Sequence, residues 1–211
     1  KKVLTIGGVL AGTTIIYLLI HNSVIGSVGV DSIPVVDNSL MATDSKVEQK
    51  ATAILIMGKY LLLLFFPHPL SSDYSYNTIP IVTSGANFGF LLAFFIHIGL
   101  VIYALMKIRE KNILSYCILF YFITMSLASN LIMLIGTNMA ERLLYVPSLG
   151  FTIAAAVLLA RVFKTNPNGQ YATLGNMYKQ NKGFLGVAIA ISLAFGYKTY
   201  DRNKDWTTVK Y

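Results

Sequence analysis

The stretch GANFGFLLAFFIHIGLVIYALM (85–106), followed at once by KIREK (107–111), decides the fold class. It contains no Asp, Glu, Lys or Arg. A bilayer core about 30 Å thick needs about 20 helical residues, and this run has the required length. Basic residues directly after such a run are typical of the cytoplasmic end of a membrane helix. The stretch therefore predicts a transmembrane helix.

The whole chain has the composition of a membrane protein. Of its 211 residues 55% are hydrophobic and only 12% are charged, which is outside the balance of a soluble domain. Further long apolar runs lie at 3–20, 113–135, 148–163 and 183–197. We expect an all-α, polytopic transmembrane helix bundle with about five spans, and we assign 1–200 to this membrane portion.

The apolar run at 51–66 is short and carries Lys59 in its middle. A charge at the centre of a membrane helix costs about 2.5–3.5 kcal/mol on insertion scales. If this run crossed the bilayer, every later loop would also change sides. We therefore expect a re-entrant or interfacial helix; the alternative is a tilted span whose Lys59 reaches the headgroups.

The distribution of charge predicts the topology. The net charge is +8, but the basic residues lie at the ends of apolar runs instead of forming one surface for nucleic acid. The basic turns at 107–111 and 161–182 are expected in the cytoplasm. The outer loops 21–50, 67–84 and 136–147 are then expected on the opposite side.

Several kinds of site are not indicated by the sequence. It has no Walker loop, CxxC pair, HExxH helix or dinucleotide fingerprint, and Cys117 is its single cysteine, so we expect no metal site and no cofactor bound by this chain. We interpret His97 as a packed, hydrogen-bonded interhelical residue. We expect Ser126, Ser129 and Asn130 to form interhelical hydrogen bonds.

The first outer constellation is PHPLSSDY (67–74), where two prolines end the preceding helix. A functional interpretation makes His68 or Asp73 a proton acceptor or a substrate ligand. The alternative is an interfacial turn, in which Asp73 caps the backbone and Tyr74 lies at headgroup depth.

The second outer constellation is TNMAERLLYVPSLGF (137–151), in which Glu141 and Arg142 border an apolar span and Pro147 breaks the helix. The planar fork of Arg142 suits phosphate or carboxylate. On an α-helix Glu141 and Tyr145 share a face, whereas Arg142 points elsewhere. The alternative is an arginine that reaches to lipid headgroups beside a structural glutamate.

The strings LLLLFFPHPLSSDYSYNTIPIV (61–82) and NMAERLLYVPSLGF (138–151) together resemble the TMTC family, the transmembrane and tetratricopeptide-repeat-containing proteins, in its bacterial form. The resemblance covers roughly 35–165. In this family a membrane half of the GT-C glycosyltransferase type is followed by tetratricopeptide repeats outside the cytoplasm. Eukaryotic members are linked to O-mannosylation with dolichyl-phosphate-mannose.

The resemblance implies an integral membrane glycosyltransferase that transfers a sugar from a polyprenyl-phosphate donor to a protein acceptor. It implies a bacterial inner membrane with the active side toward the periplasm. We expect this chain to be the carboxy-terminal membrane portion, with 201–211 starting a tetratricopeptide-like segment and the catalytic acid upstream. A need for a divalent metal stays open. The alternative function is a non-catalytic scaffold that carries a repeat domain in a larger membrane-protein complex.

The resemblance also implies roles for individual residues. Arg142 is expected to bind the lipid phosphate, because a cation stabilises the charge that develops on a leaving phosphate. The other expected substrate-binding residues come from the same two outer stretches: His68, Asp73, Tyr74, Glu141 and Tyr145.

Overall fold

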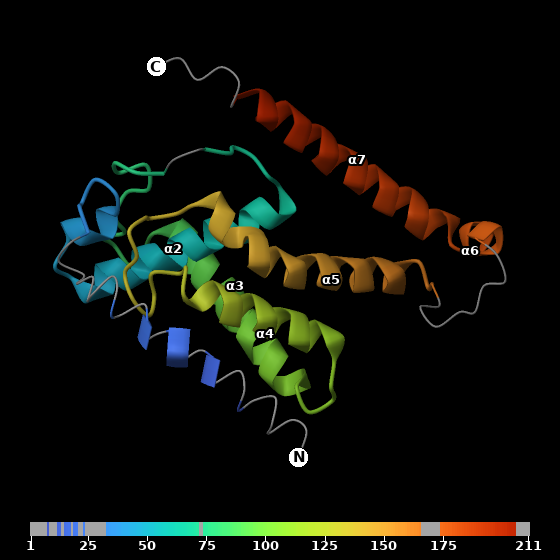
Figure 1. Cartoon of the computed structure of the whole chain (residues 1–211), viewed down its shortest axis with the longest axis horizontal. Coiled ribbons are helices and arrows are strands. Elements are labelled where there is room, and N and C mark those ends of the chain that lie inside the picture. The colour runs from blue at the N-terminus through green and yellow to red at the C-terminus, as the bar shows by residue number, and fades with distance from the viewer. Residues whose placement is uncertain are drawn as a thin grey trace.

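The computed structural model describes residues 8, 12–13, 15–17, 19–20, 23, 33–71, 74–165 and 174–205. All regular secondary structure in these ranges is helical, which confirms the all-α prediction for them. The apolar run at 3–20 lies largely outside the described residues. The elements in chain order (Figure 1) are η2 (Ser39–Ala42), α2 (Lys46–Phe65), α3 (Phe88–Lys107), α4 (Ile113–Ser126), η3 (Glu141–Leu144), α5 (Tyr145–Val162), α6 (Leu174–Gln180) and α7 (Lys182–Asp205).

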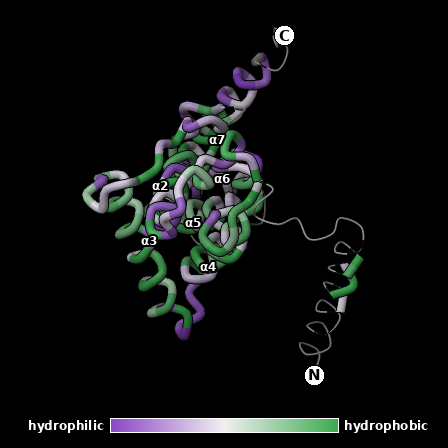
Figure 2. Tube along the Cα trace, turned by 90° about the vertical axis from the view of Figure 1, so that its left-hand side faces the viewer, coloured by the Kyte–Doolittle hydropathy of each residue, from purple (hydrophilic) through white to green (hydrophobic). Residues whose placement is uncertain are grey.

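The helices α2 to α5 form the body of the molecule. α3 packs against both α2 and α4, and α4 packs against α5. α3, α4 and α5 alternate in direction, so the long loops gather at one end and the basic turn after α3 lies at the other (Figure 1). The tube in Figure 2 is mostly hydrophobic along α3 and α4 and hydrophilic at the turn that joins them.

Three helical segments in the described residues are long and apolar enough to cross a membrane: Phe88–Lys107, Glu141–Val162 and Lys182–Lys204. α4 is apolar but has only 14 residues. The expected number of about five spans is therefore not reached among the described residues.

α4 ends at Ser126, whereas the hydropathy of 113–135 predicts a helix to the end of that run. The reason lies in polar side chains that bond to nearby backbone instead of to another helix. The Ser129 hydroxyl donates to the Ser126 backbone carbonyl at 2.8 Å, and the side-chain Oδ1 of Asn130 accepts from the Ile135 backbone amide at 2.9 Å. The Ser126 hydroxyl likewise donates to its own helix, at Ile123. The predicted interhelical bonds of these three residues are wrong.

Pro147 does not break a helix. It is buried in the first turn of α5, which begins at Tyr145. Proline is tolerated there because an amide in the first turn has no acceptor within the helix. The helix consequently starts three residues earlier than the apolar run at 148–163 predicts.

α2 is one continuous helix of 20 residues. It does not turn back within 51–66, so the re-entrant form of the prediction is wrong. Both of its halves contact the segment after α4, because the Lys50 ammonium donates to the Leu131 carbonyl and the Tyr60 hydroxyl accepts from the Ala140 amide. A helix that lies along the loop layer in this way is consistent with the interfacial form, which stays a prediction.

A network of buried asparagines joins the loops. The side-chain nitrogen of Asn38 donates to the side-chain oxygen of Asn130 at 3.1 Å and to the backbone carbonyl of Ile135 at 2.7 Å. The Asn138 side chain accepts from the Ser39 amide at 2.8 Å. The three asparagines are almost fully excluded from solvent. Since buried polar groups are stable only when bonded, this network fixes the segment before α2 against the segment after α4.

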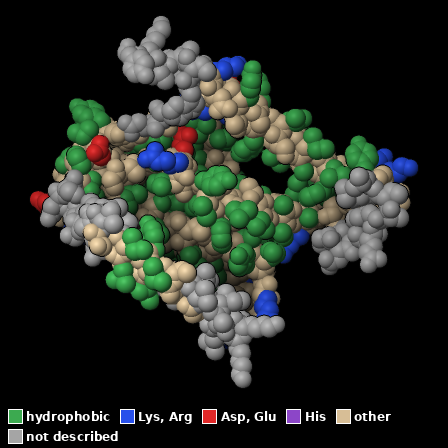
Figure 3. Space-filling model, viewed as in Figure 1, with side chains coloured by type: hydrophobic (Ala, Val, Ile, Leu, Met, Phe, Trp, Pro, Cys, Tyr) green, Lys and Arg blue, Asp and Glu red, His purple; other side chains and the backbone are tan. Residues whose placement is uncertain are grey.

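The carboxy-terminal part of the described chain is less tightly held. α6 lies in the connection between α5 and α7, and α7 contacts α5 only sparsely. α7 continues without interruption through 201–205, and residues 206–211 lie outside the described ranges. In Figure 3 apolar side chains are spread over the exposed faces of the helices, as expected for surfaces in contact with lipid.

We predict that Gly150→Ala destabilises the contact between α4 and α5. A Cβ atom added at Gly150 lies 2.7 Å from the backbone oxygen of Cys117, which cannot rotate away. Such overpacking costs about 1–3 kcal/mol. Thermal unfolding of the purified protein in detergent measures the effect.

The matched control is Gly99→Ala in α3, because a Cβ atom added at Gly99 meets no atom within 4 Å. This variant should unfold at or slightly above the wild-type temperature, since alanine favours helices more than glycine does. Equal stability of the two variants contradicts the close packing at Gly150.

Candidate functional site: the junction of two outer loops

The two outer stretches contact each other at Glu141. Its Oε1 atom accepts a hydrogen bond from the Ser71 amide at 2.7 Å and another from the Tyr74 hydroxyl at 2.9 Å. These partners lie 70 and 67 residues away along the chain. The segments 67–76 and 137–145 therefore lie on the same side of the helix body.

The position of Glu141 is set by the residues just before it. The Tyr60 hydroxyl accepts from the Ala140 amide at 2.8 Å and donates to the Ala140 carbonyl at 3.2 Å. The Asn138 side chain donates to the Tyr74 carbonyl at 3.3 Å. α2, the 74–82 segment and the 127–140 segment thus all hold the chain where it enters η3.

The environment of Tyr74 keeps its hydroxyl protonated. Burial, with the hydrogen bond to Glu141 as the second cause, raises the pKa of Tyr74 to about 12. The neutral phenol is the form that donates to the carboxylate. Because the folded pKa lies above the ordinary value, this contribution to stability is complete below about pH 10 and is lost as the pH rises through about 12.

Arg142 differs from Glu141 in that its side chain is exposed. The ion pairs found in the described residues are Lys107–Glu110 and Lys204–Asp201, and Arg142 takes part in neither. The Glu141 carboxylate is occupied by donors from the 67–76 loop. The glutamate thus bonds to the 67–76 loop, and no ion pair joins it to Arg142 in the described residues.

Tyr145 does not share a face with Glu141. Residues 141–144 form the 3-10 turn η3, which has three residues per turn, so Glu141 aligns with Leu144 instead. Tyr145 begins α5 and is 82% exposed. The predicted alignment of these two residues is wrong, because it assumed α-helical spacing.

Among the described residues, His68 is a predicted site residue that no hydrogen bond joins to this junction. His68 is exposed, and its ring lies edge-on to Phe66 with 6.0 Å between centroids. Asp73 lies outside the described residues. Within the part of the chain that the structure describes, no three His, Cys, Asp or Glu side chains are close enough to hold a metal ion.

The chemistry of the junction follows from these contacts. The exposed guanidinium next to the Glu141 carboxylate can bind an anion through two parallel hydrogen bonds. Sequence reasoning did not identify Tyr60, Asn38 or Asn138 as supports of this site. Their partners lie far away in the sequence, and no local pattern marks them.

We predict that Tyr74→Phe and Glu141→Gln each lower the free energy of unfolding by about 1 kcal/mol or more, since each removes or weakens two partly buried hydrogen bonds and the bond between the two side chains is common to both. The double variant should cost less than the sum of the two, because they disrupt the same interaction. Unfolding in detergent, at neutral pH and near pH 12, gives the free energies of unfolding of the single and double variants. The effect of Tyr74→Phe should disappear at the higher pH.

The matched control is Tyr76→Phe in the same loop, whose side chain is 80% exposed. It should leave the stability unchanged at both pH values. Strict additivity of the Tyr74 and Glu141 variants would show that the two loops are not joined through this bond.

Two curated proteins are similar to this chain. The Protein O-mannosyl-transferase Tmtc3 of Drosophila melanogaster is 30% identical over 178 residues, which are 82% of this chain and 18% of that protein. The human Protein O-mannosyl-transferase TMTC3 is 30% identical over 148 residues, 68% of this chain and 15% of that protein. The chain thus spans less than one fifth of the length of either relative.

No family model and no solved structure matches the chain. The similarity to two proteins with the same name, over most of this chain, supports a TMTC-like relationship. Together with the long apolar helices, it indicates a membrane protein.

Proposed function

We propose that the chain is part of an integral membrane glycosyltransferase that transfers a sugar from a polyprenyl-phosphate donor to a protein acceptor. Arg142 binds the phosphate of this donor. The reaction takes place on the non-cytoplasmic side, which is the periplasmic side in a bacterial inner membrane. Both relatives are named as protein O-mannosyl-transferases, which favours mannose as the sugar.

The observation that carries the proposal is the exposed guanidinium of Arg142 next to a carboxylate that is already bonded. A polyprenyl-phosphate sugar is an activated donor. Its transfer needs a base for the acceptor hydroxyl and positive charge on the leaving phosphate. Arg142 supplies the second requirement, because its fork matches two phosphate oxygens.

The neighbouring residues shape the site. Tyr74 and Glu141 hold the 67–76 loop beside Arg142, and the exposed Tyr145 and His68 offer polar groups to the sugar or the acceptor. Asp73 belongs to the same loop and is proposed as a substrate ligand. Glu141 is not assigned as the base, because both of its hydrogen bonds serve the loop junction.

We predict that both outer loops face the non-cytoplasmic side. In a Cys117→Ser background, a cysteine at Thr78 should react with a membrane-impermeant maleimide in intact cells. A cysteine at Glu110, in the basic turn after α3, should react only after the membrane is opened. The reverse pattern overturns the topology. The wild-type protein, in which Cys117 is buried, should stay unlabelled.

The test of the proposed function is Arg142→Ala in the full-length protein. Sugar transfer at limiting donor concentration should fall by about tenfold or more, since hydrogen bonds to a charged group contribute about 1.5–3 kcal/mol. Arg142→Lys should be intermediate, because the charge remains but the fork is lost.

The matched control is Arg161→Ala near the other end of α5, where another exposed arginine lies. Its transfer rate should equal that of the wild type. If Arg142→Ala and Arg161→Ala have the same rate of sugar transfer, Arg142 is not the phosphate ligand. Arg142 is then an arginine that reaches to lipid headgroups. Absence of any transfer by the intact protein favours the scaffold function instead.

A further inference from the structure

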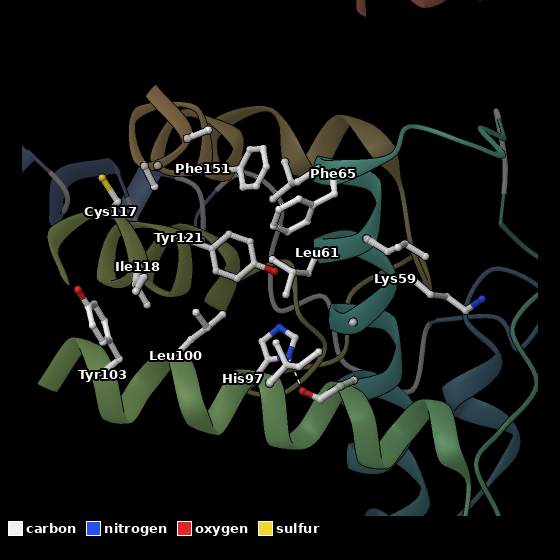
Figure 4. A pocket seen from close by; sticks show the side chains of 18 of the residues that line it. Lys59, Leu61, Phe65, His97, Leu100, Tyr103, Cys117, Ile118, Tyr121 and Phe151 are labelled. Carbon is white, nitrogen blue, oxygen red and sulfur yellow. Dashed lines mark hydrogen bonds between the residues drawn. The ribbon is translucent and has the colours of Figure 1, made fainter. Parts of the chain in front are cut away.

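A groove separate from the loop junction lies between α2, α3, α4 and α5. Its volume of about 790 Å³ is in the range of small-molecule sites, about 300–1,000 Å³. Its walls are almost entirely apolar, with residues such as Leu61, Leu100 and Phe151 (Figure 4). Arg142 and Glu141 do not line it.

Two polar atoms in the wall of this groove have no hydrogen-bond partner. They are Nε2 of His97 and the hydroxyl oxygen of Tyr121, the buried side-chain atoms without a partner in the described part of the chain. The side chains are only 8% and 5% exposed. Their ring centroids are 6.4 Å apart, and the rings lie next to each other in the groove (Figure 4).

The hydrogen-bond roles of the two atoms are complementary. His97 Nδ1 lies 2.7 Å from the Ala93 carbonyl, which can only accept, so Nδ1 carries the proton of the neutral ring. Nε2 is therefore an acceptor. The Tyr121 hydroxyl has a proton to donate. The expected interhelical bond of His97 is not formed, since its partner is in its own helix.

A hydroxyl group has the two hydrogen-bond roles that these atoms lack, since it can donate to His97 Nε2 and accept from the Tyr121 hydroxyl. Such bonds would relieve two buried groups that are otherwise without partners. A phosphate or a carboxylate does not fit, because it requires a countercharge. The one charged side chain at the groove is Lys59, and its ammonium points away from the groove (Figure 4).

We propose that this groove binds a neutral lipid with one hydroxyl group, a long-chain alcohol, with its hydroxyl between His97 and Tyr121. The apolar walls take the hydrocarbon body. A water molecule occupies only about 30 Å³ and leaves most of this apolar volume unfilled. A plain hydrocarbon chain fills the volume but leaves both polar atoms unsatisfied. The proposal does not depend on the phosphate site at Arg142.

The experiment uses the purified full chain in lipid nanodiscs and two photoreactive probes. One is a long-chain primary alcohol that carries a diazirine and an alkyne, and the other is its methyl ether. The alcohol should label peptides of α3 and α4 about tenfold more than the ether at equal concentration, because the ether cannot donate to His97.

Tyr121→Phe removes only the hydroxyl oxygen and keeps the packing of the ring. It should lower the preference for the alcohol severalfold, and His97→Phe should reduce it to that of the ether. Tyr116→Phe is the matched control, because Tyr116 lies in the same helix, is 61% exposed and does not line the groove. It should keep the wild-type preference.

Equal labelling by alcohol and ether overturns the proposal and leaves a water molecule or a membrane acyl chain as the occupant. An alcohol preference that survives both Tyr121→Phe and His97→Phe also overturns it. Arg142→Ala should retain the preference, so that a failure of the proposed transferase function and a failure of this lipid site are distinguished.

Discussion

Three buried asparagines hold the outer layer of this protein together. Asn38 and Asn130 bond to each other and to loop carbonyls, and Asn138 bonds to the segments that lead into α2 and out of the 67–76 loop. A buried amide that lost one partner would cost about 1–3 kcal/mol, so the set is stable only as a whole. Glu141 follows Asn138 by three residues, and its position depends on this network.

The junction assigns different tasks to two adjacent charges. Glu141 uses its Oε1 atom to join loops that are far apart in the sequence, whereas Arg142 keeps its side chain on the surface. No ion pair joins the two side chains in the described residues. The guanidinium therefore remains available to an external anion.

Hydropathy was sufficient to predict α3, and it predicted α5 and α7 apart from their ends. It failed for the end of α4, because asparagine and serine side chains bond to backbone there within an otherwise apolar run. The basic turns at 107–111 and 161–182 predicted that the two outer stretches lie on one side. Their contact at Glu141 was not predicted by any local pattern. The contact of Tyr60 with Ala140 joins residues 80 positions apart, and no spacing rule in a single sequence predicts such a pair.

α2 has contacts of two kinds within one turn. Tyr60 holds the Ala140 backbone on the loop side, while the next residue, Leu61, forms part of the groove wall. Within one α-helix adjacent residues keep a fixed spacing of about 1.5 Å along the axis, so the groove wall and the anchor of the segment that carries Glu141 and Arg142 keep a fixed separation. A single helix thus connects the interior of the bundle with its charged outer edge.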